Sequence, residues 1–357
     1  MALLNPALTR TQALVVATAA VFTVVAGVSV AAGAPDVERF VVAGLGLAAL
    51  AALVGESTEQ VGEHLGPGPT GLLQSTLGNI PELLVAIFAL RLGLTAVVQA
   101  ALVGSVLSNV LLVLGTAFVS GGARHGPQQF LPEAPRMLVT LLTLAVGALL
   151  VPTLAAHLST PAAHHIAALS DTAAVVLLVV YVASVPFWLG GGPEPSAPAP
   201  SNPHRWRLGF SITVLALACL ASGAVSEWFV DALKPATHSL GLSQVFTGLV
   251  VVAIASNAVE HATGIRFAWK ARPDFAISTI LNSPLQVALL LTPVLVLSSR
   301  YVGPMQLTLV FPPLLVAALA VAIIVVAVVV YDGEYSWLEG VALVALYVIV
   351  SAAFWWG

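Results

Sequence analysis

Eleven long apolar stretches constrain this chain more than any other feature. A helix needs about 20 mostly apolar residues to cross the hydrocarbon core of a bilayer. The stretches of that length are 12–33, 37–64, 70–92, 94–120, 136–156, 170–190, 208–233, 243–270, 274–299, 302–330 and 336–356. We therefore predict an all-α polytopic membrane protein with about 11 transmembrane helices.

The charge content supports the same class. Only 8% of the 357 residues are charged, whereas a soluble domain has about 25%. A surface with so few charges must face lipid. The net charge of −4 argues against a nucleic-acid partner, and a single cysteine, Cys219, excludes a disulfide scaffold. No phosphate-binding loop is present, so we expect neither ATP-driven transport nor an enzyme, and no cofactor besides a transported cation.

Basic residues are unequally divided between the two sides of the predicted bundle. With the N-terminus inside, the inner segments contain Arg10, Arg124, Arg136, Arg205, Arg207, Arg266, Lys270 and Arg272. The outer segments contain Arg39, Arg91, Lys234 and Arg300. Cytoplasmic segments are enriched in Lys and Arg, so we expect a cytoplasmic N-terminus and an external C-terminus. A high content of Ala, Val and Leu with almost no Lys suggests a GC-rich bacterial genome. We therefore expect the protein in a bacterial inner membrane. Nothing in the sequence indicates an oligomeric state.

One polar motif occurs once in each half of the chain. Asn79-Ile80-Pro81-Glu82 lies in the third stretch and Asn257-Ala258-Val259-Glu260 in the eighth. The pairs matched by a single offset are Asn79 with Asn257, Glu82 with Glu260, and Ser105 with Ser283. A further match, which needs a loop insertion, places Thr58-Glu59 on Ser226-Glu227. The chain therefore contains an internal repeat.

The two copies lie five predicted helices apart. Consecutive units with an odd number of spans enter the membrane from opposite sides, which is the inverted-repeat architecture of secondary transporters. The predicted organisation is an N-terminal transmembrane helix (1–36), a first repeat (37–190), a Pro/Gly-rich cytoplasmic linker (191–207) and a second repeat (208–357). The first apolar run is longer than that of a usual signal peptide, so we interpret it as a spanning helix.

The motif has the chemistry of a cation site. Asn and Glu at positions i and i+3 share one helix face, and Gly78, Pro81 and Ser256 are residues that loosen or break a helix. Carboxylate, amide and freed backbone oxygens are ligands for hard cations such as Ca²⁺, Mn²⁺ or Na⁺. One carboxylate from each repeat would neutralise one divalent cation. A purely structural role is less favoured, because burying two symmetric carboxylates in a bilayer is costly.

These features favour a secondary antiporter of a hard cation, and the family resemblance given below implies export of Ca²⁺ or a similar cation in exchange for H⁺. Glu82 and Glu260 would bind the cation or protons in competition. A Na⁺-, K⁺- or Mn²⁺-coupled exchanger on the same scaffold is the first alternative. A cation channel is a weaker one, because an internal inverted repeat favours alternating access over a pore. An intramembrane hydrolase is weaker still, since the Asn beside each Glu suits coordination better than water activation.

Four segments resemble the signatures of a known family. The runs 78–90 and 104–115 resemble the first signature of the calcium/cation antiporter superfamily, in its calcium/proton exchanger branch. The runs 257–262 and 283–287 are similar to the second. The resemblance covers most of the chain from about residue 59 to 293.

The resemblance implies a set of site residues between the third and eighth helices. The implied cation ligands are Glu82, Glu260, Asn79 and Asn257, with backbone oxygens near Gly78 and Ser256. Glu59, Glu227 and His261 match the access and proton path. Glu56 shares a helix face with Glu59, so we assign it to the same path. Ser105, Asn109, Ser283 and Gln286 would be supporting polar residues.

Two features depart from the family pattern. Arg266 lies six residues beyond Glu260, where it would either oppose a bound cation or reach the inner membrane surface. The acidic helix that many relatives carry between the halves is replaced by the Pro-rich linker, which leaves the regulation by cytosolic calcium in doubt.

Overall fold

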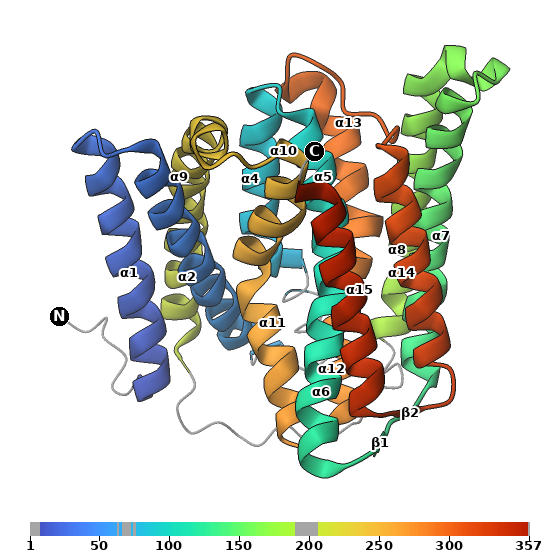
Figure 1. Ribbon diagram of the computed structural model, residues 1–357. Helices are drawn as coiled ribbons and strands as arrows, with labels where there is room; N and C mark the ends of the chain where they lie inside the picture. The colour runs from blue at the N-terminus through green and yellow to red at the C-terminus, as the bar shows by residue number, and fades with distance from the viewer. Residues whose placement is uncertain (1–7, 63, 66–72, 74–75, 190–205, 356–357) are drawn as a thin grey trace.

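The computed structural model describes residues 8–62, 64–65, 73, 76–189 and 206–355, which form a mostly helical bundle (Figure 1). The linker predicted over 191–207 lies almost wholly outside these residues. The helices are α1 (Arg10–Ala31), α2 (Asp36–Gly62), α4 (Ile80–Arg91), α5 (Thr95–Leu107), α6 (Leu114–His125), α7 (Glu133–His157), α8 (Ile166–Leu189), α9 (Leu208–Leu240), α10 (Gln244–Phe246), α11 (Ala253–Trp269), α12 (Pro273–Gln286), α13 (Thr292–Val302), α14 (Pro313–Val329) and α15 (Trp337–Trp355).

Short irregular elements interrupt or join these helices. Three are π-helical: η1 (Ser108–Val113), η3 (Thr247–Val252) and η4 (Val287–Leu291). The 3₁₀ turn η2 (Pro161–His165) joins α7 to α8. The strands β1 (Gln128–Gln129) and β2 (Glu334–Tyr335) pair antiparallel and connect the α6–α7 loop with the α14–α15 loop.

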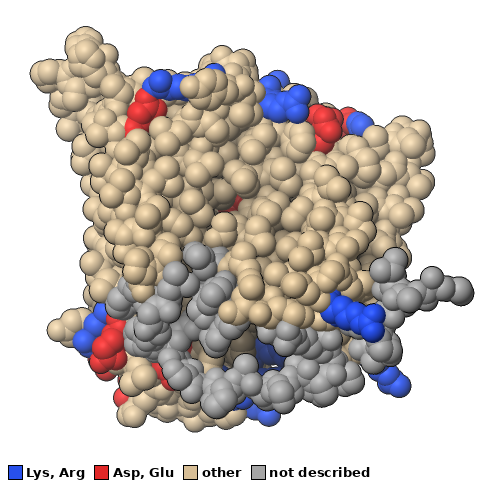
Figure 2. Space-filling view, turned by 180° about the vertical axis from the view of Figure 1, so that it is seen from behind, with Lys and Arg blue, Asp and Glu red and all other residues tan. Residues whose placement is uncertain are grey.

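The helices have the length and composition of membrane spans. Within the described residues, eight are long and apolar enough to cross a bilayer, and a ninth is added if the bent pair Gln244–Ala258 and Glu260–Trp269 is one span. Figure 2 shows the charged residues along the upper and lower edges, with an almost uncharged band between them. The protein is therefore an integral membrane protein, and the full number of 11 spans stays a prediction.

Three helices stand beside the rest of the bundle. In Figure 1, α1, α2 and α9 form a group on the left. α2 packs along α9, where Phe40 stacks on Phe229 with ring centroids 4.7 Å apart. The group meets the remaining helices mainly through α2 with α11 and α9 with α4, and α2 has a smaller contact with α4. The internal repeat relates α2 to α9 and α4 to α11. The contact of α2 with α11 is therefore the counterpart of the contact of α9 with α4.

The segment between α13 and α14 differs from the prediction. A helix was expected over 302–330, but the helical part begins at Pro313. Side chains of distant helices bind the backbone of the preceding residues: Gln99 donates to the carbonyls of Thr308 and Val310, and Thr153 Oγ1 accepts from the Phe311 amide. These bonds satisfy backbone groups of an irregular segment whose Leu307, Leu309 and Phe311 are buried.

The centre of the bundle depends on two glycines that allow backbones to touch. A Cβ atom on Gly104 of α5 would lie 2.1 Å from the carbonyl oxygen of Leu249 in η3. A Cβ atom on Gly248 would lie 2.5 Å from the carbonyl oxygen of Val97. Small residues permit such close helix contacts in membranes.

We expect Gly104→Ala to destabilise the protein, because overpacking of this kind costs about 1–3 kcal/mol. The measurement is thermal unfolding of purified protein in detergent. Gly147→Ala is the matched control, since a Cβ atom there meets nothing within 4 Å. The control should keep or slightly raise the melting temperature, and equal melting of both variants would contradict the close packing.

Candidate functional site

Each motif glutamate follows a break in its helix. In the first repeat the helical residues 76–78 end at Asn79, and α4 begins at Ile80 with a proline in its first turn. In the second repeat the segments Gln244–Ala258 and Glu260–Trp269 meet at an angle of 68°. Ser256 loosens this helix further, because its hydroxyl donates to the carbonyl of Val252 at 3.0 Å. The breaks expected from Gly78, Pro81 and Ser256 are therefore present.

The two breaks bring the carboxylates of both halves together. Glu82 is 3% exposed, and Glu260 Oε2 is inaccessible to solvent. The two side chains are close enough to repel each other when ionised. Glu260 also reaches the first repeat directly, since its Oε1 lies 3.5 Å from the position a Cβ atom would take on Gly78. The Gly78 backbone can thus approach the carboxylate of the other half.

Amide side chains link the halves around this pair. Asn79 donates to Gln286 Oε1 at 3.1 Å, and Asn257 donates to Ser105 Oγ at 3.1 Å. Each bond joins one repeat to the other. Ser105 and Asn257 flank the Glu82 carboxylate, but the Asn257 amide directs its hydrogens to Ser105, Ala253 and Ser256 instead.

Several oxygens at this centre are buried without a hydrogen-bond partner. They are both carboxylate oxygens of Glu82, Glu260 Oε2, Asn109 Oδ1 and Ser283 Oγ. The ion pairs in the described part of the chain, Arg39 with Asp36 and Arg300 with Asp171, include neither motif glutamate. A buried carboxylate needs a proton or a positive charge. This oxygen-rich set fits a hard cation.

A site rich in His or Cys is not found in the part of the chain that the structure covers. No group of three or more His, Cys, Asp or Glu is close enough to hold a metal ion there. The oxygens available are therefore two carboxylates with amide, hydroxyl and backbone groups. Such sets suit Ca²⁺ and Na⁺ better than Zn²⁺ or Cu⁺.

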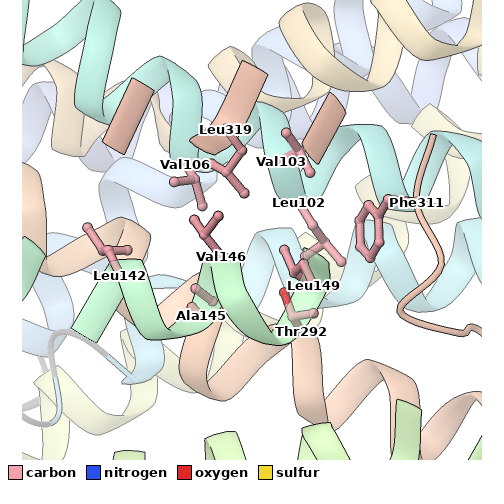
Figure 3. Close-up of a pocket in the computed structure, with 11 residues that line it drawn as sticks. Leu102, Val103, Val106, Leu142, Ala145, Val146, Leu149, Thr292, Phe311 and Leu319 are labelled. Atoms are coloured by element: carbon pink, nitrogen blue, oxygen red, sulfur yellow. The ribbon is translucent and has the colours of Figure 1, made fainter. Parts of the chain in front are cut away.

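The larger of two cavities in the described part of the chain is not this site. Figure 3 shows it between α5, α7, α14 and the start of α13, with Thr292 its one polar lining residue. The Thr292 hydroxyl donates to the carbonyl of Val287 rather than into the cavity. A smaller cavity adjoins Glu82 and is otherwise lined by apolar side chains. Leu102 lines both and separates them.

The residues assigned to the access path lie in the helices around the site. Glu59 on α2 and Glu227 on α9 are exposed, whereas His261 is buried with Nε2 unpartnered. Arg266 is exposed in the last turn of α11, which supports the interpretation that it extends to the membrane surface. Glu56 is half-buried and accepts hydrogen bonds from two glutamines, Gln12 and Gln60.

The π-helical segments are not predicted by the sequence patterns described above. η1 follows Ser105 and η4 follows Ser283, at positions related by the repeat offset. π-helical turns are frequent at functional sites. No composition signal marks them, but the ungapped offset predicts that an irregularity in one copy recurs in the other. Gln12 and Gln60 were also missed, although a glutamine in an apolar span is itself a signal.

Comparison with known proteins agrees with this geometry. The sequence model of a family described as sodium/calcium exchanger protein matches residues 38–189 and again residues 210–356. The chain belongs to this family. The resemblance to calcium/cation antiporters is thereby confirmed.

Two of the similar proteins are named as antiporters and are matched over nine tenths of their length or more. A Ca²⁺/H⁺ antiporter of Synechocystis sp. is 38% identical over 339 residues, covering 88% of this chain and 90% of that protein. The Ca²⁺/H⁺ antiporter ChaA of Bacillus subtilis is 34% identical over 335 residues, covering 90% and 92%. The solved structure of native YfkE superposes with a TM-score of 0.82 at 30% identity, covering 96% of this chain and 99% of that one. The H⁺/Ca²⁺ exchanger CAX, with a TM-score of 0.78 and 16% identity over 97% and 92% of the two chains, shares the fold.

Proposed function

We propose that this protein is a secondary active antiporter that exports Ca²⁺ in exchange for H⁺ by alternating access. The observation that carries the proposal is the pair of glutamates, one from each half, with three of their four carboxylate oxygens buried and without a hydrogen-bond partner. Neither glutamate has a basic partner in the described part of the chain. The relatives named as Ca²⁺/H⁺ antiporters support the choice of ions.

The coupling follows from charge neutrality. One Ca²⁺ or two protons neutralise the pair of glutamates, and either load allows the site helices to move past the hydrocarbon without a bare charge. The empty and ionised pair cannot move, because its two charges repel each other in a low-dielectric interior. Ca²⁺ and H⁺ therefore bind alternately to the same oxygens, and uncoupled leak of either ion is prevented.

The proposed ligand set follows from the donors around the pair. Glu82 and Glu260 are the central ligands, with Asn79, Asn257 and backbone oxygens near Gly78 and Ser256 completing the oxygen shell that Ca²⁺ requires. The supporting polar residues, which hold these ligands or add an oxygen, are Ser105, Asn109, Ser283 and Gln286.

Two inverted repeats of five spans, 37–190 and 208–357, would supply the moving parts of the transporter. The contacts of α2 with α11 and of α9 with α4 support this assignment, because each repeat's first helix packs on the other repeat's motif helix. In this arrangement α2 and α9 alternately open the site, and Glu59, Glu227 and His261 line the path of ions and protons. The excess of basic residues in the predicted inner segments supports a cytoplasmic N-terminus. The Ala-, Val- and Leu-rich composition with almost no Lys supports a bacterial inner membrane.

Ion flux into reconstituted vesicles tests the function. An imposed proton gradient, acid inside, should drive Ca²⁺ uptake, and collapse of the gradient should stop it. Uptake driven by a Na⁺ or K⁺ gradient instead would identify the alternative exchanger. Uptake that needs no counter-ion gradient would identify a channel and refute the proposal.

We expect Glu59→Gln and Glu227→Gln to slow transport rather than to abolish binding. Each residue lies on a helix that packs against a motif helix, so its charge acts on passage and not on the bound cation. A loss of about tenfold in rate corresponds to about 1.4 kcal/mol added to the barrier. Calorimetric Ca²⁺ binding to each purified variant should stay near wild type, and a loss of binding would place these residues in the cation site.

A further inference from the structure

A buried polar network joins three helices at the lower end of the bundle. Gln12 of α1 donates to Glu56 Oε1 of α2 at 2.8 Å, and Gln60 of α2 donates to the same oxygen at 3.3 Å. The backbone amide of Trp206, just before α9, donates to Gln60 Oε1 at 2.9 Å. Gln12, Gln60 and Trp206 are each at most 5% exposed. Glu56 thus binds α1, and Gln60, one helical turn further along α2, binds the segment just before α9.

Gln12 is fixed from both sides of its amide group. Its Oε1 accepts from the Thr9 backbone amide at 3.0 Å, and its own backbone amide donates to Thr9 Oγ1 at 3.2 Å, which forms a capping box at the start of α1. Its Nε2 remains for Glu56. The side chain is therefore positioned for the bond to α2 by the end of its own helix.

This bond adds to the packing of α1 against α2, and it is important because most of α1 is not buried. Only 17% of its most apolar 18-residue window is buried, and Val21, Val24 and Val28 are exposed. Lipid is as apolar as these side chains, so no hydrophobic driving force holds α1 against its neighbours. Interhelical hydrogen bonds and close packing must do so. Gly27, which would place a Cβ atom 3.2 Å from the Trp228 ring, supplies such packing to α9.

We propose that Glu56 is a positioning residue that holds α1, α2 and the start of α9 together, so that the three helices move as one unit against the cation site. This inference rests on the proposed alternating access. α2 and α9 pack on different motif helices, α11 and α4, and both contacts must change together when the site opens to one side. A network that ties α2 to α1 and to the start of α9 keeps their relative arrangement during that movement.

A charge swap between positions 12 and 56 tests the pair. Gln12→Glu places a second carboxylate against Glu56, while its capping box is kept, because Glu serves there as well as Gln. Glu56→Gln keeps an acceptor for both glutamines and serves as the second single variant of the cycle. The double variant Gln12→Glu/Glu56→Gln restores an amide–carboxylate bond in the reverse direction. All four proteins are compared by melting temperature in detergent and by proton-driven Ca²⁺ uptake into vesicles.

We expect Gln12→Glu to lower the melting temperature and to reduce the maximal rate by about tenfold at an unchanged half-saturating Ca²⁺ concentration. The double variant should restore the melting temperature and bring the maximal rate to within about twofold of the wild-type value. If the effects of the two substitutions on melting temperature and rate simply add, the proposed interaction between Gln12 and Glu56 is wrong. Coupling seen in melting but not in the maximal rate would overturn the movement as one unit. Absence of Ca²⁺ uptake by the wild-type protein would refute the proposed function instead, and the melting temperatures would still decide the pair.

Discussion

Glu82→Gln and Glu260→Gln should each abolish proton-driven Ca²⁺ uptake. Glutamine keeps the size of the side chain but removes one negative charge, and the remaining carboxylate cannot neutralise a divalent cation in a buried site. Removing one partner of a buried charge pair costs about 3–5 kcal/mol, which corresponds to more than about 100-fold in Ca²⁺ affinity. Uptake into vesicles and calorimetric Ca²⁺ binding measure the two losses.

Glu38→Gln is the matched control for these variants. Glu38 is an exposed carboxylate at the start of α2, far along the helix from the site end. The Glu38→Gln variant should transport Ca²⁺ at the wild-type rate. Wild-type rates in the Glu82 or Glu260 variants, with normal yield and melting temperature, would remove these residues from the cation site.

The apparent Ca²⁺ affinity of the wild-type protein should rise with pH. At low pH protons occupy the carboxylates that Ca²⁺ must bind, so binding has to displace them, and the affinity is low. As pH rises and the empty site loses its protons, less displacement is needed and the affinity increases. Where the site is already ionised, the affinity levels off. Calorimetry from about pH 5.5 to about pH 8.5 measures the curve.

Glu59→Gln serves as a reference for this curve, because a residue of the access path should shift the transport rate without flattening the affinity. A Ca²⁺ affinity that is constant over the whole range would exclude direct competition. A Na⁺- or K⁺-coupled exchanger would then be the better interpretation.

The sequence predicts the helices well because each depends on local composition. An apolar run of spanning length forms a helix whatever surrounds it, since the backbone has no other way to satisfy its hydrogen bonds in lipid. The segment before Pro313 is the exception. There Gln99 and Thr153, more than 150 residues away in the chain, bind its backbone, and no local pattern reveals such partners.

The site is predictable in its residues but not in its pairings. The repeat places a Glu and an Asn in each half, and Pro81 marks the break in the first. That Asn79 binds Gln286 while Asn257 binds Ser105 depends on how the halves pack, and the two bonds do not follow the repeat symmetry. The bond from Gln12 to Glu56 likewise does not follow from the repeat, because Gln12 lies on a helix outside both repeats.

Proton release on Ca²⁺ binding tests the shared site most directly. Ca²⁺ is added to purified protein in weakly buffered detergent solution near neutral pH, and the released protons are counted with a pH indicator against the bound Ca²⁺. Competition for Glu82 and Glu260 predicts release that scales with binding, decreases as the starting pH is raised, and disappears in Glu82→Gln. Ca²⁺ binding to the wild-type protein without any proton release would contradict the account.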